Sequence, residues 1–319
     1  MVNAESPHVP VMPEETLRYL APKDGGRYVD GTVGLGGHSS RILAAADCRV
    51  LGLDRDASAL ALAGERLRSF GEKAVLRHSR FSDVAARLDS LGWETIDGAL
   101  IDIGVSSLQL DSPERGFSFL REGPLDMRMD ATGGDTGVAA PSAAKLVNTA
   151  PFKVLEELIA TAGEEPQAGR IARAIINARE KRPIATTTEL AAVVEAAYPA
   201  KWRATAKNHP ATRTFQALRI AVNDEFGQLR SFLKDVTPRL APGGTLVVIS
   251  FHSLEDRIVK HFLRDEATGC RCPRHAPLCV CNHAASLELL TRKPVMASEE
   301  EVRRNPRAGS AKLRAAKKV

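Results

Sequence analysis

The chain has 319 residues, 44% of them hydrophobic, and a net charge of +5 from 44 basic and 39 acidic side chains. This length and apolar content are enough for one large domain or two smaller ones with substantial cores. No apolar run approaches the length of about eighteen residues that a membrane span needs, and the N-terminal stretch lacks an apolar signal segment. We therefore expect a soluble, cytoplasmic protein without a membrane partner.

The first hundred residues alternate between strand and helix patterns. A short β-prone run at Tyr28 and Val29 is followed by a glycine-rich turn. Helices are predicted over 37–46, 57–70 and 84–91, and strands over 50–53, 74–76 and 96–103. Such alternation is typical of βαβ units in a parallel sheet.

The alternation of strand and helix patterns stops after the fourth predicted strand. Residues 105–140 are punctuated by glycine and proline, and 143–197 show helical periodicity, with Thr188 as the expected N-cap of the third helix. A further helix begins near Thr214, and the pattern ends with a strand (243–250), a helix (254–263) and two final strands (287–291 and 310–315). The predicted architecture is α/β and mostly parallel, with a small helical domain inserted. Its expected parts are 1–110, 111–212 and 213–319.

The glycine-rich turn after the first strand indicates a nucleoside-cofactor site. Its distinctive residues are Asp30, Gly31, Gly34, Gly36 and Gly37, and Asp54 ends the second strand. An acid at the end of the second strand is placed to accept hydrogen bonds from ribose hydroxyls. The glycine order departs from the G-x-G-x-x-G of dinucleotide sites, and a carboxylate at Asp30 would repel a pyrophosphate. S-adenosylmethionine, which has a sulfonium and an ammonium but no phosphate, fits better. A turn whose glycines serve shape alone is the alternative.

Polar or aromatic residues follow all five predicted strands of the parallel sheet. They are Asp30, Asp54, Phe81, Asp102 and the segment 250–252. Ligands of doubly wound sheets bind at this edge, so the convergence predicts one site. Structural interpretations remain as alternatives: Asp30 and Asp102 as helix caps or turn formers, Phe81 as core, and His38 and His252 as structural histidines.

Two polar segments stand out. Segment 208–219 mixes amides, cations and an aromatic side chain, and segment 250–257 places polar groups directly after a buried strand. Such groups can hold an unstacked nucleobase by edge hydrogen bonds and stacking. Two basic blocks without acids, 199–220 and a tail at 302–319, suit a polyanionic partner. Solvated basic faces are the alternative for both blocks.

Four of the five cysteines lie in one stretch, Cys270, Cys272, Cys279 and Cys281, with His275 and His283 nearby. In a reduced compartment such thiols indicate either a structural zinc or a redox-inert loop, and the C-x-C spacing departs from the usual C-x-x-C pair. Both alternatives stay open. Cys48, alone at the edge of a strand, is predicted to be a small core residue.

Several long strings give the chain a family resemblance that runs in order over nearly its whole length. They are DGTVGLGGH (30–38), DIGVSSLQLD (102–111), RGFSF (115–119), GPLDMRMD (123–130), HPATRTFQALR (209–219), SFHSLEDR (250–257) and NPRA (305–308). The chain resembles the bacterial small-subunit rRNA (cytosine-N4)-methyltransferase family, RsmH or MraW. The resemblance implies a Rossmann-like S-adenosylmethionine domain with a helical insertion. It also implies N4 methylation of a cytidine in the 16S rRNA decoding centre, on the small ribosomal subunit.

Matching the family motifs position by position assigns the cofactor contacts. They are Gly36, Gly37, His38, Asp54, Phe81, Asp102 and Gln109. The Cys-rich stretch 270–283, which only some members carry, is the main departure.

The exocyclic amine of cytosine must be pulled towards tetrahedral geometry by acceptors for its hydrogens. The usual amino-methyltransferase signature, Asp/Asn-Pro-Pro-Tyr/Phe, is replaced at 102–105 by DIGV. We therefore expect Asp102 and the segment 250–252 to supply the acceptors, with His252 as a candidate proton acceptor.

Two other functions compete with a methyltransferase. A nicotinamide-dependent oxidoreductase is disfavoured by the glycine order, and a cofactor-binding assay separates the two. A non-catalytic ribosome-assembly or RNA-binding protein is disfavoured by the acids at the strand ends, for which an inactive site has no use.

Overall fold

The computed structural model describes residues 10–130, 140–205, 208–270, 272, 278, 280, 281 and 284–319. It divides into two compact units, one formed by Met1–Gly104 with Phe226–Val319 and the other by Val105–Glu225. The boundaries expected from the sequence, after 110 and after 212, differ from these. The difference at the second boundary arises because helix α11 (Thr212–Asn223) places Phe215 and Leu218 in the core of the second unit.

The first unit is built on one eight-stranded sheet in the order β3-β2-β1-β4-β5-β8-β6, with β7 paired to β8. The strands are β1 (Arg27–Asp30), β2 (Arg49–Asp54), β3 (Ala74–His78), β4 (Ile96–Asp102), β5 (Leu240–Ser250), β6 (Leu287–Leu289), β7 (Val295–Met296) and β8 (Lys312–Lys318). β1 to β5 pair in parallel, whereas β8 runs antiparallel to β5, β6 and β7. The mostly parallel α/β architecture is as predicted.

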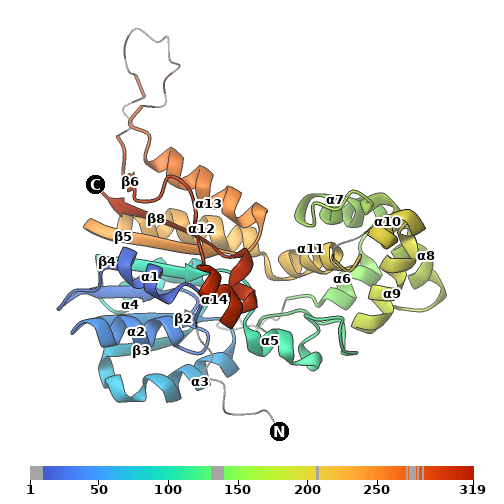
Figure 1. Cartoon of the computed structure of the whole chain (residues 1–319), viewed down its shortest axis with the longest axis horizontal. Coiled ribbons are helices and arrows are strands. Elements are labelled where there is room, and N and C mark those ends of the chain that lie inside the picture. Colours follow the sequence, from blue (N-terminus) through green and yellow to red (C-terminus); the bar gives the residue numbers. More distant parts are fainter. Residues whose placement is uncertain are drawn as a thin grey trace. The chain divides into compact units, whose positions relative to one another are not determined.

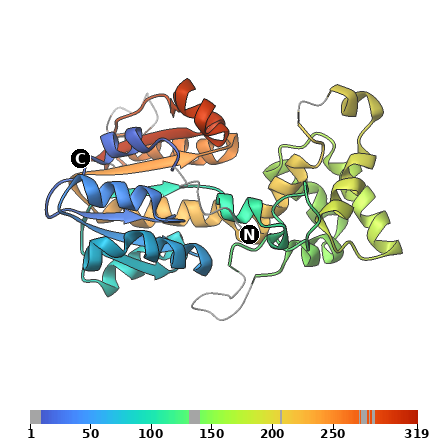
Figure 2. The ribbon, with the colours of Figure 1, turned by 60° about the horizontal axis from the view of Figure 1, so that its bottom comes forward.

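Helices cover both faces of this sheet (Figures 1 and 2). They are α1 (Pro13–Leu20), α2 (Gly37–Ala45), α3 (Ala57–Leu67), α4 (Val84–Ser90), α12 (Glu225–Val236), α13 (Ser253–Glu266) and α14 (Glu299–Arg304). The first three share one apolar cluster with the sheet, and α4, α12 and α13 share another. Within the described ranges, no helix is both long and apolar enough to span a bilayer.

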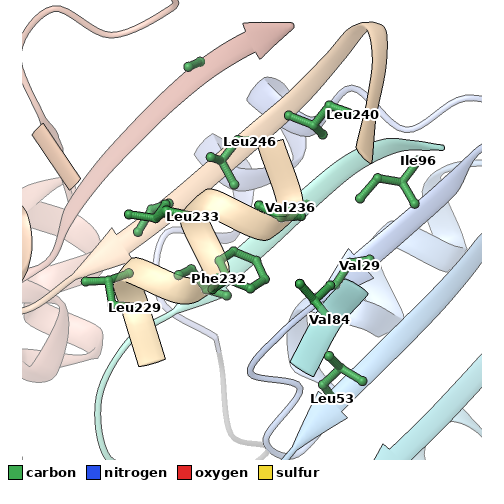
Figure 3. Packing of buried hydrophobic residues seen from close by; sticks show 14 of the residues in the cluster. Val29, Leu53, Val84, Ile96, Leu229, Phe232, Leu233, Val236, Leu240 and Leu246 are labelled. Atoms are coloured by element: carbon green, nitrogen blue, oxygen red, sulfur yellow. The ribbon is translucent and has the colours of Figure 1, made fainter. Parts of the chain in front are cut away.

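Alternate residues of the central strands point to opposite faces of the sheet and so belong to the two apolar clusters in turn. In β4, Ala99 and Ile101 belong to one cluster and Leu100 to the other, and β5 alternates in the same way. Figure 3 shows the α12 side of the sheet, where Phe232 and Val236 lie over residues of the strands. Strands buried on both faces explain the continuous apolar runs of the sequence.

Gly31, directly after β1, sits where the backbone is too closely packed for a side chain. A Cβ there would lie 2.7 Å from Cγ2 of Ile101 and 3.1 Å from Cβ of Phe81. Gly31→Ala is expected to lower the free energy of unfolding by about 1–3 kcal/mol because the core must shift to admit the methyl group. Urea unfolding measures the change.

Gly64 provides the matched control, since it lies inside α3 and its Cβ would meet only Leu76 Cδ1 at 3.9 Å. Gly64→Ala is expected to raise the free energy of unfolding by about 0.5–1 kcal/mol through helix propensity. Equal stability of the two variants would show that Gly31 is not tightly packed.

The second unit is helical. Besides α11 it contains α5 (Ser107–Asp111), α6 (Ala143–Thr149), α7 (Phe152–Ala162), α8 (Ala168–Lys181), α9 (Thr187–Ala197) and α10 (Ala200–Thr205). Its core is formed by the predicted apolar positions of α7, α8 and α9, including Leu155, Ile171 and Leu190. The short α5 was not predicted, because its five residues fall in the glycine- and proline-rich stretch.

The N-cap of α9 is Thr186, so the prediction of Thr188 was wrong. The Thr186 hydroxyl accepts a hydrogen bond from the Glu189 N–H, and the Glu189 side chain reaches back to the Thr186 N–H. This reciprocal pair requires a spacing of three residues, which Thr186 has and Thr188 lacks.

Part of the basic block 302–319, for which a polyanionic partner is predicted and a solvated face is the alternative, forms strand β8 of the sheet. β8 lies between β5 and β6, and Arg314 is only 6% exposed. Its guanidinium donates to the Asp256 carboxylate, with Nε 2.6 Å from Oδ1. Lys317 pairs with Glu288. Arg314 and Lys317 therefore serve the fold, whereas Arg303, Arg304 and Arg307 of the same block are exposed.

Candidate active site

The turn between β1 and α2 is shaped by glycines with left-handed backbone. Gly34 has φ 49° and Gly36, the N-cap of α2, has φ 77°. Both values lie in the region that glycine adopts without strain. The Gly34 N–H donates to Oδ2 of Asp54 at 2.8 Å, which ties the turn to the end of β2. The two features that predicted a nucleoside site are therefore in direct contact.

Asp30 lies beneath this turn and is 1% exposed. Its carboxylate accepts hydrogen bonds from the Thr32 N–H (3.2 Å) and from the Ser39 hydroxyl (2.7 Å). Burial raises the pKa of Asp30, and His38 acts in the opposite direction. Asp30 thus fixes the turn from within, which favours the turn-former interpretation of this residue.

Asp54 ends β2 with both carboxylate oxygens engaged by backbone. Oδ2 accepts from Gly34 and Oδ1 accepts from the Asp56 N–H at 2.9 Å. Desolvation outweighs these bonds and raises the pKa of Asp54 from 3.8 to about 6. Each oxygen keeps a second lone pair, so the group can still accept hydroxyl donors.

Asp102 and His38 meet at the carboxyl edge of the sheet. His38, on α2, is 6% exposed, and its Nε2 lies 3.8 Å from Oδ2 of Asp102, the last residue of β4. Within the described ranges, His38 Nε2 and Asp102 Oδ1 are buried without a hydrogen-bond partner. Such atoms are costly unless a ligand completes them. Strand order reverses between β1 and β4, which is where α/β sheets bind ligands.

The main-chain N–H of Asp102 donates to the Thr32 hydroxyl at 2.6 Å. Thr32 therefore links the glycine turn to the end of β4. Sequence reasoning missed this residue, although its position between Gly31 and Gly34 was a signal.

Phe81 follows β3 in a short 3₁₀ turn, Phe81–Asp83. Its ring packs edge-to-face on Phe232 with centroids 5.8 Å apart. The residue is only partly buried, so it serves the core and also leaves surface at the edge of the sheet. Its two interpretations are therefore compatible.

His252 begins α13 as its N-cap. Its Nδ1 accepts a hydrogen bond from the Glu255 N–H at 3.4 Å, and Nε2 lies 2.9 Å from Oε1 of Glu255. The Glu255 carboxylate accepts from the Phe251 and His252 N–H groups. A ring whose Nδ1 accepts carries its proton on Nε2, so this conformation leaves no lone pair for a substrate proton. Ser250, also predicted as an acceptor, is 2% exposed, and its hydroxyl faces the Lys312 carbonyl.

His252→Asn separates capping from proton transfer. Asparagine caps helices well, so we expect the unfolding midpoint to be kept and kcat to fall by no more than about threefold. His252→Ala removes the cap and should cost about 1 kcal/mol of stability. A folded Asn variant with kcat reduced about 10²-fold or more would instead establish the proton-acceptor role predicted from the sequence.

Gln109, the remaining predicted cofactor contact, belongs to the second unit. It is 4% exposed, and its side chain accepts from the Ser106 N–H as part of the capping box of α5. The described contacts of Gln109 are thus structural, and its contact with a cofactor remains a prediction.

The polar segment 208–219 is largely built into the second unit. Phe215 is 4% exposed and packs against Phe119, with ring centroids 4.8 Å apart. Arg213 donates to the Glu164 carbonyl, and Arg219 forms a bidentate pair with Glu225. The expectation that this aromatic side chain stacks on a base was wrong, because helical periodicity turns it into the core.

The chemistry of the strand-end residues fits S-adenosylmethionine. His38 and Asp102 have buried polar atoms without a hydrogen-bond partner among the described residues, and a polar ligand would satisfy them. The carboxylates of Asp54 and Asp102 at the edge of the sheet favour hydroxyl or cationic groups over a pyrophosphate. Asp54 can accept from a ribose, and the left-handed glycines let the ligand approach the main chain.

Comparison with known proteins decides the family. The model of the MraW methylase family matches residues 5–319. The chain belongs to the MraW methylase family. It is 61% identical to the ribosomal RNA small subunit methyltransferase H of Nitratidesulfovibrio vulgaris strain DP4, over 98% of this chain and 95% of that one. The proteins of the same name from Oleidesulfovibrio alaskensis and Lawsonia intracellularis are 58% and 51% identical, over 98% of this chain and 95% and 99% of theirs.

A solved structure of a putative methyltransferase from Streptococcus mutans in complex with SAH is a remote match. It is 10% identical, with a TM-score of 0.44, over 96% of this chain and 97% of that one. This likeness is too low to support an inference. Membership of the MraW methylase family confirms the resemblance seen in the sequence motifs and makes the chain an S-adenosylmethionine-dependent methyltransferase. The oxidoreductase alternative is thereby excluded.

Proposed function

We propose that the chain methylates the exocyclic N4 amine of one cytidine in the 16S rRNA decoding centre, using S-adenosylmethionine. The observation that carries the proposal is the buried, unpartnered carboxylate oxygen of Asp102 at the end of β4, beside His38. Family membership and the names of the relatives support the reaction and the small-subunit substrate.

Gly36, Gly37, His38, Asp54, Phe81 and Asp102 hold the cofactor, and Gln109 is proposed as a further contact. Asp54 accepts the ribose hydroxyls, and Phe81 lies at the adenine. Bound S-adenosylmethionine supplies an electrophilic methyl group on a sulfonium. The protein orients and desolvates the reacting groups, since the amine attacks in line without covalent help from the chain.

Asp102 is proposed to accept a hydrogen bond from the cytosine amine. The amine lone pair is delocalised into the ring, and an acceptor for its hydrogen draws the nitrogen towards tetrahedral geometry. Asp102 pairs with Ile249 across β4 and β5, so the end of β4 lies beside the segment that begins at Ser250. A strong base is unnecessary because the amine becomes acidic as the bond forms. His252 stays as the alternative acceptor that the asparagine variant decides.

Exposed cations of α10 are proposed to contact rRNA phosphates. Lys201 and Arg203 are exposed there, together with Trp202. Replacing both cations by alanine should weaken rRNA binding and reduce the slope of log K against log salt by about 1.5, because each phosphate contact contributes about 0.7–0.9. Filter binding at several salt concentrations measures the slope. Lys153→Ala, which removes an exposed cation that pairs with Glu156 on α7, is the control and should leave the slope unchanged.

The direct test is transfer of labelled methyl to small subunits that lack the modification, followed by nucleoside mapping. N4-methylated cytidine at a single decoding-centre position is the expected product. Label on another nucleoside would refute the target. Binding of S-adenosylmethionine without transfer to any assembly state of the small subunit would favour the non-catalytic ribosome-assembly protein. The proposed location, the cytoplasm, follows from this substrate.

A further inference from the structure

Three cysteine thiols converge in the connection between α13 and β6. The Sγ atoms of Cys270, Cys272 and Cys281 all lie within 4.8 Å of one another. The base of this connection is closed by a hydrogen bond from the Ser286 N–H to the Glu266 carbonyl at 2.8 Å. Nothing in the methyl-transfer site uses these thiols.

The sulfur positions match the spacing of metal-bound thiolates. Two thiolates 2.3 Å from a tetrahedral zinc ion lie about 3.8 Å apart. Sγ of Cys281 and Sγ of Cys270 are 3.8 Å apart. A disulfide would need about 2.05 Å, so the two sulfurs are not bonded to each other, and their separation is compatible with two ligands of one ion.

Main-chain donors point at two of the sulfurs. The Cys272 N–H donates to Sγ of Cys270 and the Val280 N–H donates to Sγ of Cys272, both at 3.4 Å. These two contacts hold the sulfurs of Cys270 and Cys272 on the inner side of the turn.

We propose that Cys270, Cys272 and Cys281 bind a structural zinc ion, with each thiol giving up its proton on binding. Tetrahedral zinc takes one ligand besides these three thiolates. Cys279, His275 and His283 of the same stretch lie outside the described residues. The ion would crosslink the connection between α13 and β6 above its closed base. Cys270 is exposed and Cys272 and Cys281 are partly buried, which suits a structural role, since catalytic zinc sites are buried in a shaped cavity and keep an open position.

Metal analysis of the purified, fully reduced protein tests the site. We expect about one zinc per chain, released by a thiol-modifying reagent, and an intense thiolate-to-metal absorption when cobalt replaces zinc. Cys270→Ser and Cys281→Ser should each bind zinc at least about tenfold more weakly. Cys48→Ser is the matched control, because Cys48 is a buried core residue of the first unit and should leave the zinc content unchanged.

Binding of S-adenosylmethionine to each variant reports that it is folded. Reduced wild-type protein that takes up neither zinc nor cobalt would overturn the site. So would a folded Cys270→Ser, Cys281→Ser double variant that retains the zinc content of the wild type.

Discussion

Asp102→Ala is expected to lower kcat for methyl transfer by about 10²- to 10³-fold, the range seen when one group that stabilises a transition state is removed. The reason is geometric, because the Asp102 carboxylate presents a buried oxygen without a hydrogen-bond partner among the described residues. Asp102→Asn keeps one acceptor oxygen and should be less affected. Single-turnover kinetics at saturating S-adenosylmethionine measures the chemical step.

Stability separates a functional role from a structural one. Among the described residues Oδ1 of Asp102 is buried without a hydrogen-bond partner and Oδ2 has a 3.8 Å contact with His38, so the unfolding midpoint of Asp102→Ala should be little changed or raised. Asp97, at the other end of β4, pairs with Lys23 at 2.7 Å and provides the control. Asp97→Asn should keep kcat within about threefold. A folded Asp102→Ala protein with wild-type kcat would remove Asp102 from the mechanism.

Asp54→Asn is expected to raise the Kd for S-adenosylmethionine by about 10- to 100-fold, because asparagine keeps one acceptor oxygen and the loss of one charged hydrogen bond to a ribose hydroxyl costs about 1.5–3 kcal/mol. In the free protein, burial raises the pKa of Asp54 from 3.8 to about 6. Hydroxyl donors favour the charged form, so binding lowers this pKa. Affinity should therefore rise with pH up to about 6 and level off above it, falling by up to about tenfold per unit below.

The contribution of Asp54 to folding has the opposite sign. Its pKa is raised by folding, so this contribution is fully present below pH 3.8 and is lost as pH rises through about 6. Calorimetric titrations with S-adenosylmethionine between pH 5 and 8 follow the affinity. Asp47→Asn, which alters an exposed acid paired with Lys73, should keep the wild-type profile. An Asp54→Asn protein with the wild-type pH profile would show that another group binds the ribose.

Periodicity and strand-end chemistry predicted the architecture because both are written into local sequence. β4 and β5 are buried on both faces and appear in the sequence as continuous apolar runs. The glycines mark the turn after β1 directly, and Asp54 marks the end of β2. The contact of Asp54 with Gly34 follows from parallel strands ending at one edge.

Contacts between residues far apart in the chain could not be predicted from local sequence. The basic residues of β8 were assigned to a polyanionic partner because the partners of Arg314 and Lys317 lie far away in the chain, at Asp256 and Glu288. Phe215 looked available for stacking until helix packing placed it in a core. The break between α11 and α12 depends on Asp224, whose left-handed φ of 48° has no strong sequence signal.

The central claim is that this chain installs one N4-methyl group on 16S rRNA through the site at the end of β4. It is tested most directly by nucleoside mass spectrometry of 16S rRNA from cells that lack the endogenous enzyme and express either this chain or its Asp102→Ala variant. The account predicts N4-methylated cytidine at the decoding centre with the wild-type chain, and a loss of it with the variant at equal expression. Absence of the modification with both proteins, or its presence at equal rate with both, would contradict the account.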